Sequence, residues 1–594
     1  MRKILCLTLA FLCILSLSAC GGSPASVSSP EVQQTANPSA ETPVAVEPQT
    51  PAPAASTPDS AEPVSLGLDG LVSIDSFSFP SRYDLREIGL VTEVKDQGPY
   101  GTCWAFCLAN AMESNALVRG YGKYDLSEYQ IAYLCTHILP DQLSMTESEG
   151  PKCNGVWYNG PYSGILSSSL LQAYAIQTEA EYPYSNIEEP LPEDGASIDG
   201  ALYVDSCYTV PASDTEAMKE LLMKNGSLYM CVCALCWADE TGSYCDWSTG
   251  AAYLPRYTTK YPRIDHFVSI IGWDDDYSSD HFKTTPPGDG AWIIKNSWGT
   301  DFGDEPMPLG GELVTEIGDG GCFYVSYYDA AFNALNSATS ITVKNERSYD
   351  RVYQYDGGAG LLYADKVTDV TIQITALENE SIAGVRIKPT GKISYNNFYC
   401  GNWAFEEANA RIRVYKGTFD AASAEDAEPI YTQDYAIAYP DYQTIEFNKE
   451  VPLCKGEEYY IRVSFDRPIC YALDGKQSLF WSYENVAGGN PGETFVKTEN
   501  REGLGEWHDT TAIPGKTFPS SACFKVLTKD SLFPQPGNEE APSTDLTGHG
   551  VAEEVDTEFN LPSSSFPIWP VLFIGALAVG FAIIILLIKK KKQS

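Results

Sequence analysis

The sequence is poor in basic residues and in histidine. Lys and Arg total 39 against 79 Asp and Glu, which leaves a formal net charge of −40. Because a strongly negative field repels phosphate groups, we expect no nucleic-acid ligand and no binding to an anionic lipid surface. With only five His in the chain, few positions can supply an imidazole base.

The length of 594 residues is too great for one hydrophobic core and indicates two or more domains. The N-terminus has two basic residues and then an apolar run that is too short to span a bilayer, so residues 1–19 are predicted to be a secretory signal peptide. Leu17-Ser-Ala-Cys20 resembles a bacterial lipoprotein box, which predicts an acyl group on Cys20. The alternative is ordinary signal cleavage beside an incidental cysteine. Residues 20–77 form a Pro-, Ala- and Ser-rich linker.

The other chain end predicts a membrane anchor. An acidic linker at residues 531–566 precedes an uncharged apolar run of 21 residues, Ile568–Ile588, and four lysines follow it. A run of this length spans a bilayer as a helix, and flanking lysines stay in the cytoplasm. We therefore expect a transmembrane helix at 568–588, a cytoplasmic basic tail at 589–594, and the rest of the chain outside a bacterial cell. Leu561–Ser565 resembles a sortase signal without its Thr-Gly, so wall sorting is the less favoured alternative.

The stretch Lys95–Phe106 predicts a reactive cysteine. Gln97 lies six residues before Cys103, a Gly-containing turn separates them, and an apolar run that reads as a buried helix starts at Trp104. At a helix N-terminus, free backbone N–H groups and the macrodipole stabilise a thiolate. The Cys103 N–H and the Gln97 amide could together bind an oxyanion. The alternative is an inert buried cysteine.

Two apolar, β-rich runs carry candidate partners for this cysteine. Residues 264–273 contain His266 near their start, and residues 290–299 end in Asn296 and Trp298. A thiol nucleophile needs a base, and the base needs a third group to fix its ring. If the two strands are neighbours, His266 is the predicted base and Asn296 the predicted orienting residue. The alternative for His266 is a histidine satisfied within the core.

The order Gln97, Cys103, His266, Asn296 resembles the papain family of cysteine peptidases. Phe79-Pro-Ser-Arg-Tyr-Asp-Leu-Arg-Glu87 is similar to the start of a mature enzyme, and the likeness extends to about Asp329. The resemblance implies an α+β peptidase domain at residues 78–335, with a helical lobe that carries Cys103 and a β-rich lobe that carries His266 and Asn296. It implies hydrolysis of protein or peptide substrates, without a cofactor.

The resemblance also suggests substrate contacts and shows departures. Asn159-Gly160 matches a loop that binds the substrate backbone, although Cys153-Asn-Gly155 is a second possible register. Phe267 matches a position that lines the main specificity pocket, and Trp298 would shield the His–Asn pair. This sequence has Tyr100 and Thr102 where the family pattern has Cys and then Ser or Ala. The long interval from Cys103 to His266 implies insertions around 135–157 and 231–257.

Residues 345–530 are predicted to be an all-β sandwich or jelly roll. Their segments Val352–Asp356, Ala410–Tyr415 and Glu457–Ser464 alternate or are rich in β-branched and aromatic residues, with Gly, Pro and Asp turns between them. Tyr349–Gly358 resembles part of the lectin-like domain that follows papain-like peptidases in bacterial surface proteins. That resemblance implies a possible glycan ligand, although aromatic residues of β-domains more often form cores.

Two clusters resemble metal sites without predicting one. Cys231-x-Cys233-x-x-Cys236, with Cys245 beyond, has spacing similar to zinc ligands, but a core strand with disulfides or buried thiols is favoured. Asp274–Asp276 with Asp280 could bind calcium, but a solvated acidic loop is favoured. No metal site is therefore expected.

Three functions remain open from the sequence. The first is a membrane-tethered extracellular cysteine endopeptidase with a lectin-like accessory domain. The second is a surface adhesin or carbohydrate-binding protein on an inactive peptidase fold, which the intact set of four residues disfavours. The third is a Cys-His peptidoglycan hydrolase of the NlpC type, which the Gln-to-Cys spacing and the Asn-Ser-Trp motif disfavour.

Overall fold

The structure is a computed structural model. It describes residues 78–137, 151–153, 175–192, 195, 199–237, 242, 244–256, 266–301, 307–309, 312–333, 337–356, 362–397, 400–475, 477–479, 483–485, 489–499, 505–514 and 519–530. The predicted signal peptide, both linkers, Cys20, the predicted transmembrane helix at 568–588 and the basic tail lie outside these ranges. Within the described ranges, no helix combines the length and the apolar character needed to cross a bilayer.

One ten-stranded sheet organises the first part of the chain. Its order is β3-β4-β13-β5-β8-β9-β12-β7-β6, with β1 paired to β8. The strands are β1 Arg82–Asp84, β3 Ala175–Ile176, β4 Leu202–Pro211, β5 Leu228–Val232, β6 Cys245–Asp246, β7 Ala251–Ala252, β8 His266–Asp274, β9 Ala291–Lys295, β12 Cys322–Ser326 and β13 Ser337–Lys344. Strands β5 and β9 are buried along their whole length, and β8 nearly so, which explains their near-continuous apolar sequences.

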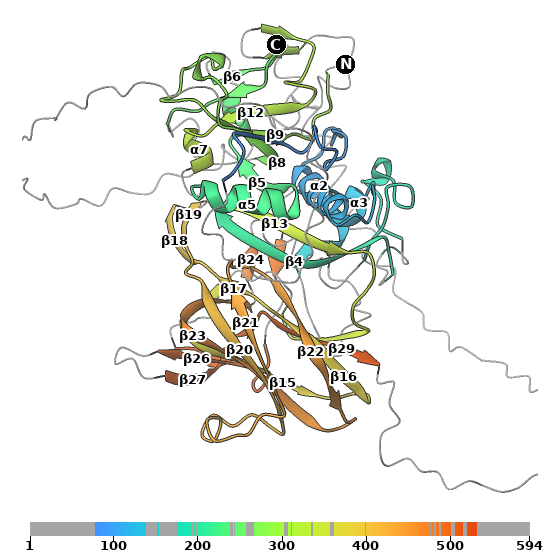
Figure 1. Ribbon diagram of the computed structural model, residues 1–594. Helices are drawn as coiled ribbons and strands as arrows, with labels where there is room; N and C mark the ends of the chain where they lie inside the picture. The colour runs from blue at the N-terminus through green and yellow to red at the C-terminus, as the bar shows by residue number, and fades with distance from the viewer. Residues whose placement is uncertain are drawn as a thin grey trace, which may run out of the picture. The chain divides into compact units, whose positions relative to one another are not determined.

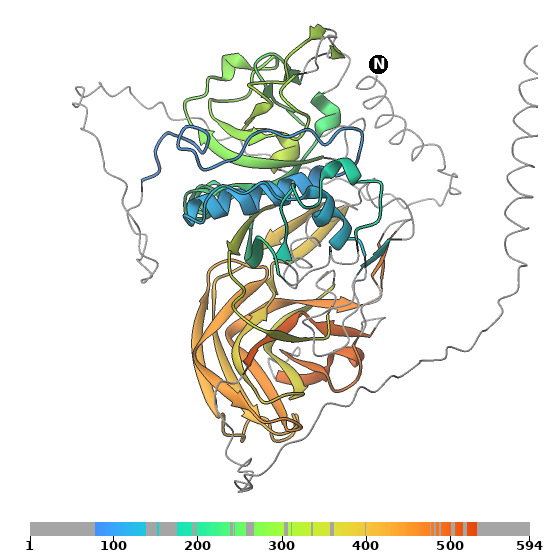
Figure 2. The same cartoon turned by 90° about the vertical axis from the view of Figure 1, so that its right-hand side faces the viewer.

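Helices accompany this sheet, and the first two of them belong to a second core. They are α2 Cys103–Val118, α3 Glu128–Leu134, α5 Thr215–Asn225, α6 Ala234–Trp237 and α7 Ala330–Asn333, with 3-10 turns η2 Tyr184–Asn186 and η4 Ser279–His281. Figure 1 shows α2 beside β8 and α3 beside α2, and Figure 2 shows α2 lengthwise in blue. Every residue from Trp104 to Ala116 is buried, and the polar side chains among them form hydrogen bonds inside the protein, at Asn110, Glu113, Ser114 and Asn115.

Helix α2 ends where its sequence stops favouring a helix. Gly120 adopts φ +73°, and the N–H groups of Gly120 and Tyr121 donate to the carbonyls of Leu117 and Ala116. This arrangement satisfies carbonyls at the end of the helix, and it needs a residue that tolerates the left-handed conformation. The predicted buried helix that starts at the candidate cysteine is confirmed.

Two hydrophobic cores correspond to the two expected lobes. One lies around α2 and α3, with Trp104, Met112 and Ile131 among its members. The other lies around β8, β9 and β12, with Ile270, Ile293 and Phe323 among its members. Phe267 packs, partly buried, against both.

The sheet extends beyond the end that the sequence predicted for the first domain. Strand β13 begins after residue 335 and pairs with β4 along its length and with β5 at Thr339–Ser340. No motif marks this strand, because its alternation of small, polar and apolar residues is common to any half-buried strand. The predicted boundary therefore leaves out a strand that the structure places inside the sheet.

The rest of the described chain is a β-sandwich. One sheet has the order β14-β29-β16-β22, and the other β21-β20-β23-β15-β26-β27 with β17 and β28 paired to β23. Residues of both sheets form one core, including Ile372, Val385 and Ile461. The three predicted segments become β14, β20 and β23, so these β-strands are confirmed. The bounds are β14 Arg351–Gln354, β15 Leu362–Thr375, β16 Glu380–Ile387, β17 Pro389–Thr390, β20 Ala408–Lys416, β21 Tyr431–Ile437, β22 Gln443–Leu453, β23 Glu458–Gly475, β26 Thr494–Glu499, β27 Gly505–Asp509, η5 Thr510–Ala512, β28 Ser520–Ala522 and β29 Phe524–Asp530.

Three small sheets complete the described structure. They are β10 Met307–Leu309 with β11 Glu312–Val314, β18 Lys392–Asn397 with β19 Cys400–Ala404, and β2 Pro151–Cys153 with β25 Tyr483–Asn485 and β24 Gln477–Leu479. Hydrogen bonds also join the sandwich to β4. The Cys207 N–H donates to the Tyr442 carbonyl at 2.7 Å, and the Thr209 hydroxyl donates to Asp441 at 2.7 Å. Part of an edge of the large sheet is thereby covered.

Candidate active site

Cys103 is the first residue of α2. The apolar face of the helix fixes this end in the core, because Trp104 and Ala105 directly after Cys103 are buried while Cys103 itself is half-buried. The backbone N–H of Phe267, on β8, lies 3.4 Å from the Cys103 sulfur. A helix N-terminus and a strand end therefore meet at this thiol, with positive partial charge from both sides.

His266 and Asn296 lie on neighbouring strands. Antiparallel pairing of β8 and β9 confirms the predicted adjacency of the two apolar runs. The Nε2 atom of His266 is 2.8 Å from Oδ1 of Asn296, and the N–H of Ser297 donates to the same oxygen at 2.8 Å. Since that oxygen can only accept, His266 carries its proton on Nε2. Its Nδ1 is then left as the basic nitrogen.

Burial controls the charge of His266. The side chain is 5% exposed, and desolvation lowers its pKa to about 4, against the opposing effect of the Asn296 hydrogen bond. A neutral imidazole is the form that can accept a proton from a thiol.

An aromatic group covers the histidine. The Trp298 ring stacks on the His266 ring at 4.6 Å between centroids, and the Trp247 ring stacks on Trp298 at 6.1 Å. Trp237 packs edge-on to Trp298 at 6.4 Å between ring centroids. The Trp247 indole N–H donates to the backbone carbonyl of Trp237. Sequence reasoning missed Trp237 and Trp247. Their position in the implied insertion at 231–257 was the available signal.

Gln97 is tied to the strand that carries Asn296. Its backbone N–H donates to the Ser297 carbonyl at 2.8 Å, and the Ser297 hydroxyl donates to its Oε1 at 2.6 Å. One N–H of the Gln97 amide donates to the Tyr100 carbonyl at 2.7 Å. The amide nitrogen has a second N–H with which it can donate to another acceptor.

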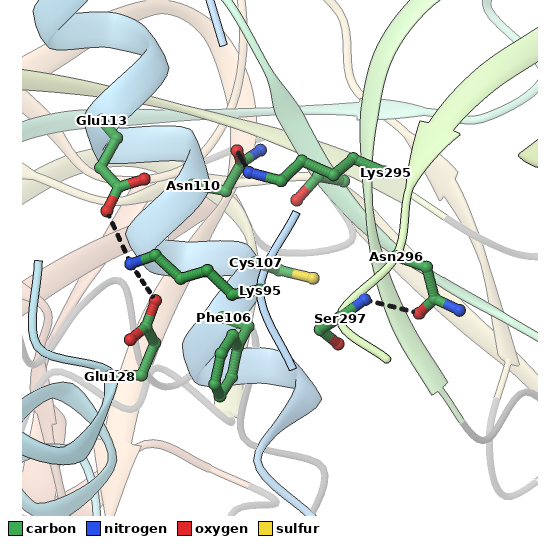
Figure 3. Close-up of a pocket in the computed structure, with 10 residues that line it drawn as sticks. Lys95, Phe106, Cys107, Asn110, Glu113, Glu128, Lys295, Asn296 and Ser297 are labelled. Carbon is green, nitrogen blue, oxygen red and sulfur yellow. Dashed lines mark hydrogen bonds and ion pairs between the residues drawn. The ribbon is translucent and has the colours of Figure 1, made fainter. Parts of the chain in front are cut away.

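A small polar cavity lies beside these residues, lined in part by Cys107, Asn296 and Ser297 (Figure 3). On one side Lys95 lies between Glu113 and Glu128, with its Nζ 3.2 and 2.7 Å from their oxygens. Although burial alone would lower it, these carboxylates raise the pKa of Lys95 above its usual value.

Lys295 lies on the other side of the cavity, one residue before Asn296. Its Nζ donates to the Thr92 carbonyl at 2.9 Å and to Asn110 Oδ1 at 2.7 Å, and burial lowers its pKa to about 8. Sequence reasoning missed this buried network, because charged residues read as surface residues without a structure.

The predicted substrate residues are only partly placed. Phe267 lies next to His266 and directly opposite Cys231 on β5, with its ring 6.4 Å from that of Tyr229. Asn159 and Gly160 lie outside the described residues.

The two metal-like clusters have other environments. Cys231, Cys233, Cys236 and Cys245 are all buried, and within the described ranges no group of three potential ligands is arranged to hold a metal. The acidic loop meets cations of the protein itself. Asp274 pairs with Arg82 at 2.7 Å, and Asp275 pairs with Lys219 at 2.6 Å.

Comparisons with known proteins identify a family for the first part of the chain. The family model described as papain family cysteine protease matches residues 79–306. These residues form a papain-family cysteine peptidase domain. Curated relatives of the domain include cysteine proteinase 15A of Pisum sativum, 29% identical over 38% of this chain and 56% of the relative. A cysteine proteinase of Trypanosoma brucei brucei is 30% identical over 39% of this chain and 44% of the relative. The chain spans about half the length of the curated relatives it matches.

Solved structures extend the likeness beyond the peptidase domain. A structure of the cysteine protease and lectin-like domains of Cwp84, a surface layer associated protein of Clostridium difficile, is 21% identical. It covers 77% of this chain and 90% of its own, with a TM-score of 0.56. A clostridial Cwp84 C116A structure after propeptide cleavage is also 21% identical, covering 76% of this chain and all of its own, with a TM-score of 0.57. This likeness shows the fold of the peptidase domain together with the β-rich region.

Proposed function

We propose that the chain is an extracellular, membrane-tethered endopeptidase that cleaves peptide bonds with Cys103, His266 and Asn296. The observation that carries this proposal is the pairing of β8 with β9. It puts His266 within hydrogen-bonding distance of Asn296, while the next residue along β8 contacts the Cys103 sulfur.

The proposed reaction is acyl transfer. The Cys103 thiol gives its proton to Nδ1 of His266, and the sulfur attacks the substrate carbonyl carbon. The resulting oxyanion accepts hydrogen bonds from the Cys103 N–H and the Gln97 amide. When the C–N bond breaks, His266 gives its proton to the leaving amine and a thioacyl-enzyme remains. Water then gives a proton to His266 and its oxygen attacks the thioester carbon. The C–S bond breaks, the carboxylic acid leaves, and His266 returns the proton to the sulfur to restore the thiol.

The surrounding residues support separate parts of this reaction. Asn296 holds the imidazole so that Nδ1 is directed to the sulfur, and Trp298 keeps water from the His–Asn hydrogen bond. For the substrate we propose that Phe267 narrows the main specificity pocket and that Asn159 and Gly160 bind the substrate backbone.

The β-rich region is proposed to be a lectin-like accessory domain. The structural neighbour Cwp84 has a lectin-like domain, and the sandwich topology of this region supports the same assignment here. A glycan ligand is part of this proposal. A glycan array probed with the full chain carrying Cys103→Ala tests this proposal. If no glycan binds, the β-rich region has a structural role instead.

The location is proposed from the sequence at the two chain ends. A spanning helix at 568–588 with its lysines inside would hold the peptidase on the outer face, and a lipid on Cys20 would add a second tether. Cell fractionation and external protease treatment test this topology. Intact chain released into the medium, or residues 79–530 shielded from protease outside accessible cells, would contradict it.

Activity and specificity are tested together by a peptide library incubated with the chain. Cleavage by the natural sequence and none by the Cys103→Ala variant is the expected result. Failure of the folded natural chain to cleave any peptide would favour the adhesin alternative.

A further inference from the structure

Both ends of the loop between Gln97 and Cys103 meet one phenol. The hydroxyl of Tyr184 lies 2.9 Å from the backbone carbonyl oxygen of Gln97 and 2.5 Å from the hydroxyl oxygen of Thr102. Gln97 and Thr102 are the residues at which this loop begins and ends. The two proposed oxyanion donors, the Gln97 amide and the Cys103 N–H, are therefore connected through Tyr184 as well as through the chain.

The directions of these two hydrogen bonds follow from the available protons. A backbone carbonyl can only accept, so Tyr184 donates its single proton to Gln97. Thr102 must then donate its proton to the Tyr184 oxygen. The result is a directed chain from Thr102 through Tyr184 to Gln97, in which each bond polarises the next.

The position of Thr102 indicates that this bond replaces its ordinary role. Thr102 is the N-cap residue of α2, where a threonine hydroxyl commonly accepts from a backbone N–H of the first helical turn. In this described segment it makes no such cap and is fully buried. The hydroxyl is committed to Tyr184, while the helix N-terminus keeps its positive end directed at the thiol.

Tyr184 is itself firmly placed. It begins η2, its backbone N–H donates to the Glu179 carboxylate at 2.7 Å, and its ring packs edge-on against Phe106 at 4.9 Å and Tyr100 at 6.2 Å. Phe106 belongs to the first turn of α2, and Tyr100 lies within the loop. The phenol is thus fixed from three directions relative to the segment that it joins.

We propose that Tyr184 and Thr102 are positioning residues that set the separation of the two oxyanion donors. This inference rests on the proposed function. Neither residue is proposed to touch the substrate. Their effect should appear only where a negatively charged carbonyl oxygen must be stabilised.

The first test is Tyr184→Phe in the full chain. Complete loss of an oxyanion donor costs about 10²- to 10³-fold in kcat. A displaced donor should cost less, so we expect kcat for a peptide to fall about tenfold with KM nearly unchanged. The Ki of a peptide aldehyde, which the thiol converts to a tetrahedral hemithioacetal, should rise by a similar factor. Alkylation of Cys103 by iodoacetamide forms no oxyanion, and its rate should stay within about twofold.

Tyr129→Phe is the matched control. The Tyr129 hydroxyl donates to the Glu189 carbonyl at 3.0 Å in the same lobe. Removing this hydroxyl deletes a hydrogen bond from a tyrosine to a backbone carbonyl, as Tyr184→Phe does. It should leave kcat and the aldehyde Ki within about twofold of the natural values.

Two substitutions of Thr102 test the role of its hydroxyl. Thr102→Val keeps the buried volume without the hydroxyl and should reproduce the effect of Tyr184→Phe, whereas Thr102→Ser should restore most of kcat. Because both residues act through one chain of bonds, the double variant Thr102→Val, Tyr184→Phe should lose little more than either single variant.

Three results would overturn the inference. They are an equal loss in alkylation and in aldehyde binding, an effect of Tyr129→Phe as large as that of Tyr184→Phe, and failure of Thr102→Ser to restore kcat. A natural chain that cleaves no peptide would instead refute the proposed function. The aldehyde comparison then still decides whether Tyr184 positions the donors.

Discussion

The peptidase domain and the β-rich region differ in what their buried polar side chains are bonded to. In the peptidase domain Gln97, His266 and Asn296 are buried near a half-buried thiol. His266 is hydrogen-bonded to Asn296, and the Ser297 hydroxyl donates to Gln97. In the β-rich region buried ion pairs instead join one part of the sandwich to another. Arg462 on β23 pairs with Asp369 on β15 at 2.8 Å, and Lys525 on β29 pairs with Asp356 at 2.8 Å.

This difference explains why the sequence of the first region indicates a reaction, whereas the sequence of the second region indicates only a fold. A nucleophile, a base and an orienting group must be particular residue types, and each leaves a local mark in the sequence. A sandwich core requires only alternating apolar residues, which many sequences satisfy. If catalysis is confined to the first region, substitutions there should lower kcat, and substitutions in the second region should not.

The largest expected effect is that of Cys103→Ala. Removing the proposed nucleophile should lower kcat by about 10⁴-fold or more, because the proposed thioacyl intermediate forms on its sulfur. Peptide hydrolysis by equal amounts of folded protein measures it. Cys107→Ser is the matched control, since Cys107 lies one turn later in α2 and burial raises the pKa of its thiol. Full activity of folded Cys103→Ala would disprove the mechanism.

Gln97→Ala should have the next largest effect. Loss of an oxyanion donor lowers kcat by about 10²- to 10³-fold and changes KM much less, because the interaction strengthens only in the transition state. Steady-state kinetics with a peptide substrate separate the two constants. A variant in which KM rises while kcat is unchanged would make Gln97 a substrate-binding residue instead.

Much of the peptidase fold could be predicted because its marks are local. Cys103 at the start of an apolar run predicted where α2 begins, and the apolar runs at 264–273 and 290–299 predicted β8 and β9. Tyr184, Thr102 and Trp247 could not be recognised in the same way, since their partners are distant in the sequence and only the fold brings them together. Strand β13 was missed for a related reason, because its place between β4 and β5 depends on pairing across more than a hundred residues.

His266 should make the stability of the peptidase domain depend on pH. Its folded pKa of about 4 lies below the unfolded value of 6.5, so the unfolded state binds more protons between these values. The contribution of neutral His266 to the free energy of unfolding is therefore fully present above about pH 6.5. It is lost as the pH falls towards 4, by about 3 kcal/mol in total.

Denaturant unfolding at pH 7 and pH 4 measures this loss, and His266→Gln isolates it. The variant cannot gain the imidazole proton, so its loss of stability should be about 3 kcal/mol smaller than that of the natural chain. Carboxylates that titrate in both proteins cancel in this difference. Equal losses would mean that His266 is not held in its neutral form by burial.

The smallest expected effect is that of Trp507→Leu in the β-rich region. Trp507 lies on β27, with the Arg462 guanidinium 5.2 Å from its ring centre and the Phe419 ring at 4.8 Å. Leucine keeps much of the apolar contact but presents no aromatic face to the cation, and Arg462 retains its pairing with Asp369. We therefore expect a loss of about 1 kcal/mol in the unfolding free energy of this region and peptide cleavage within about twofold of the natural rate. Because Trp507 packs against Arg462 and Phe419 of the β-rich region, a large loss of kcat in the folded variant would contradict the confinement of catalysis to the peptidase domain.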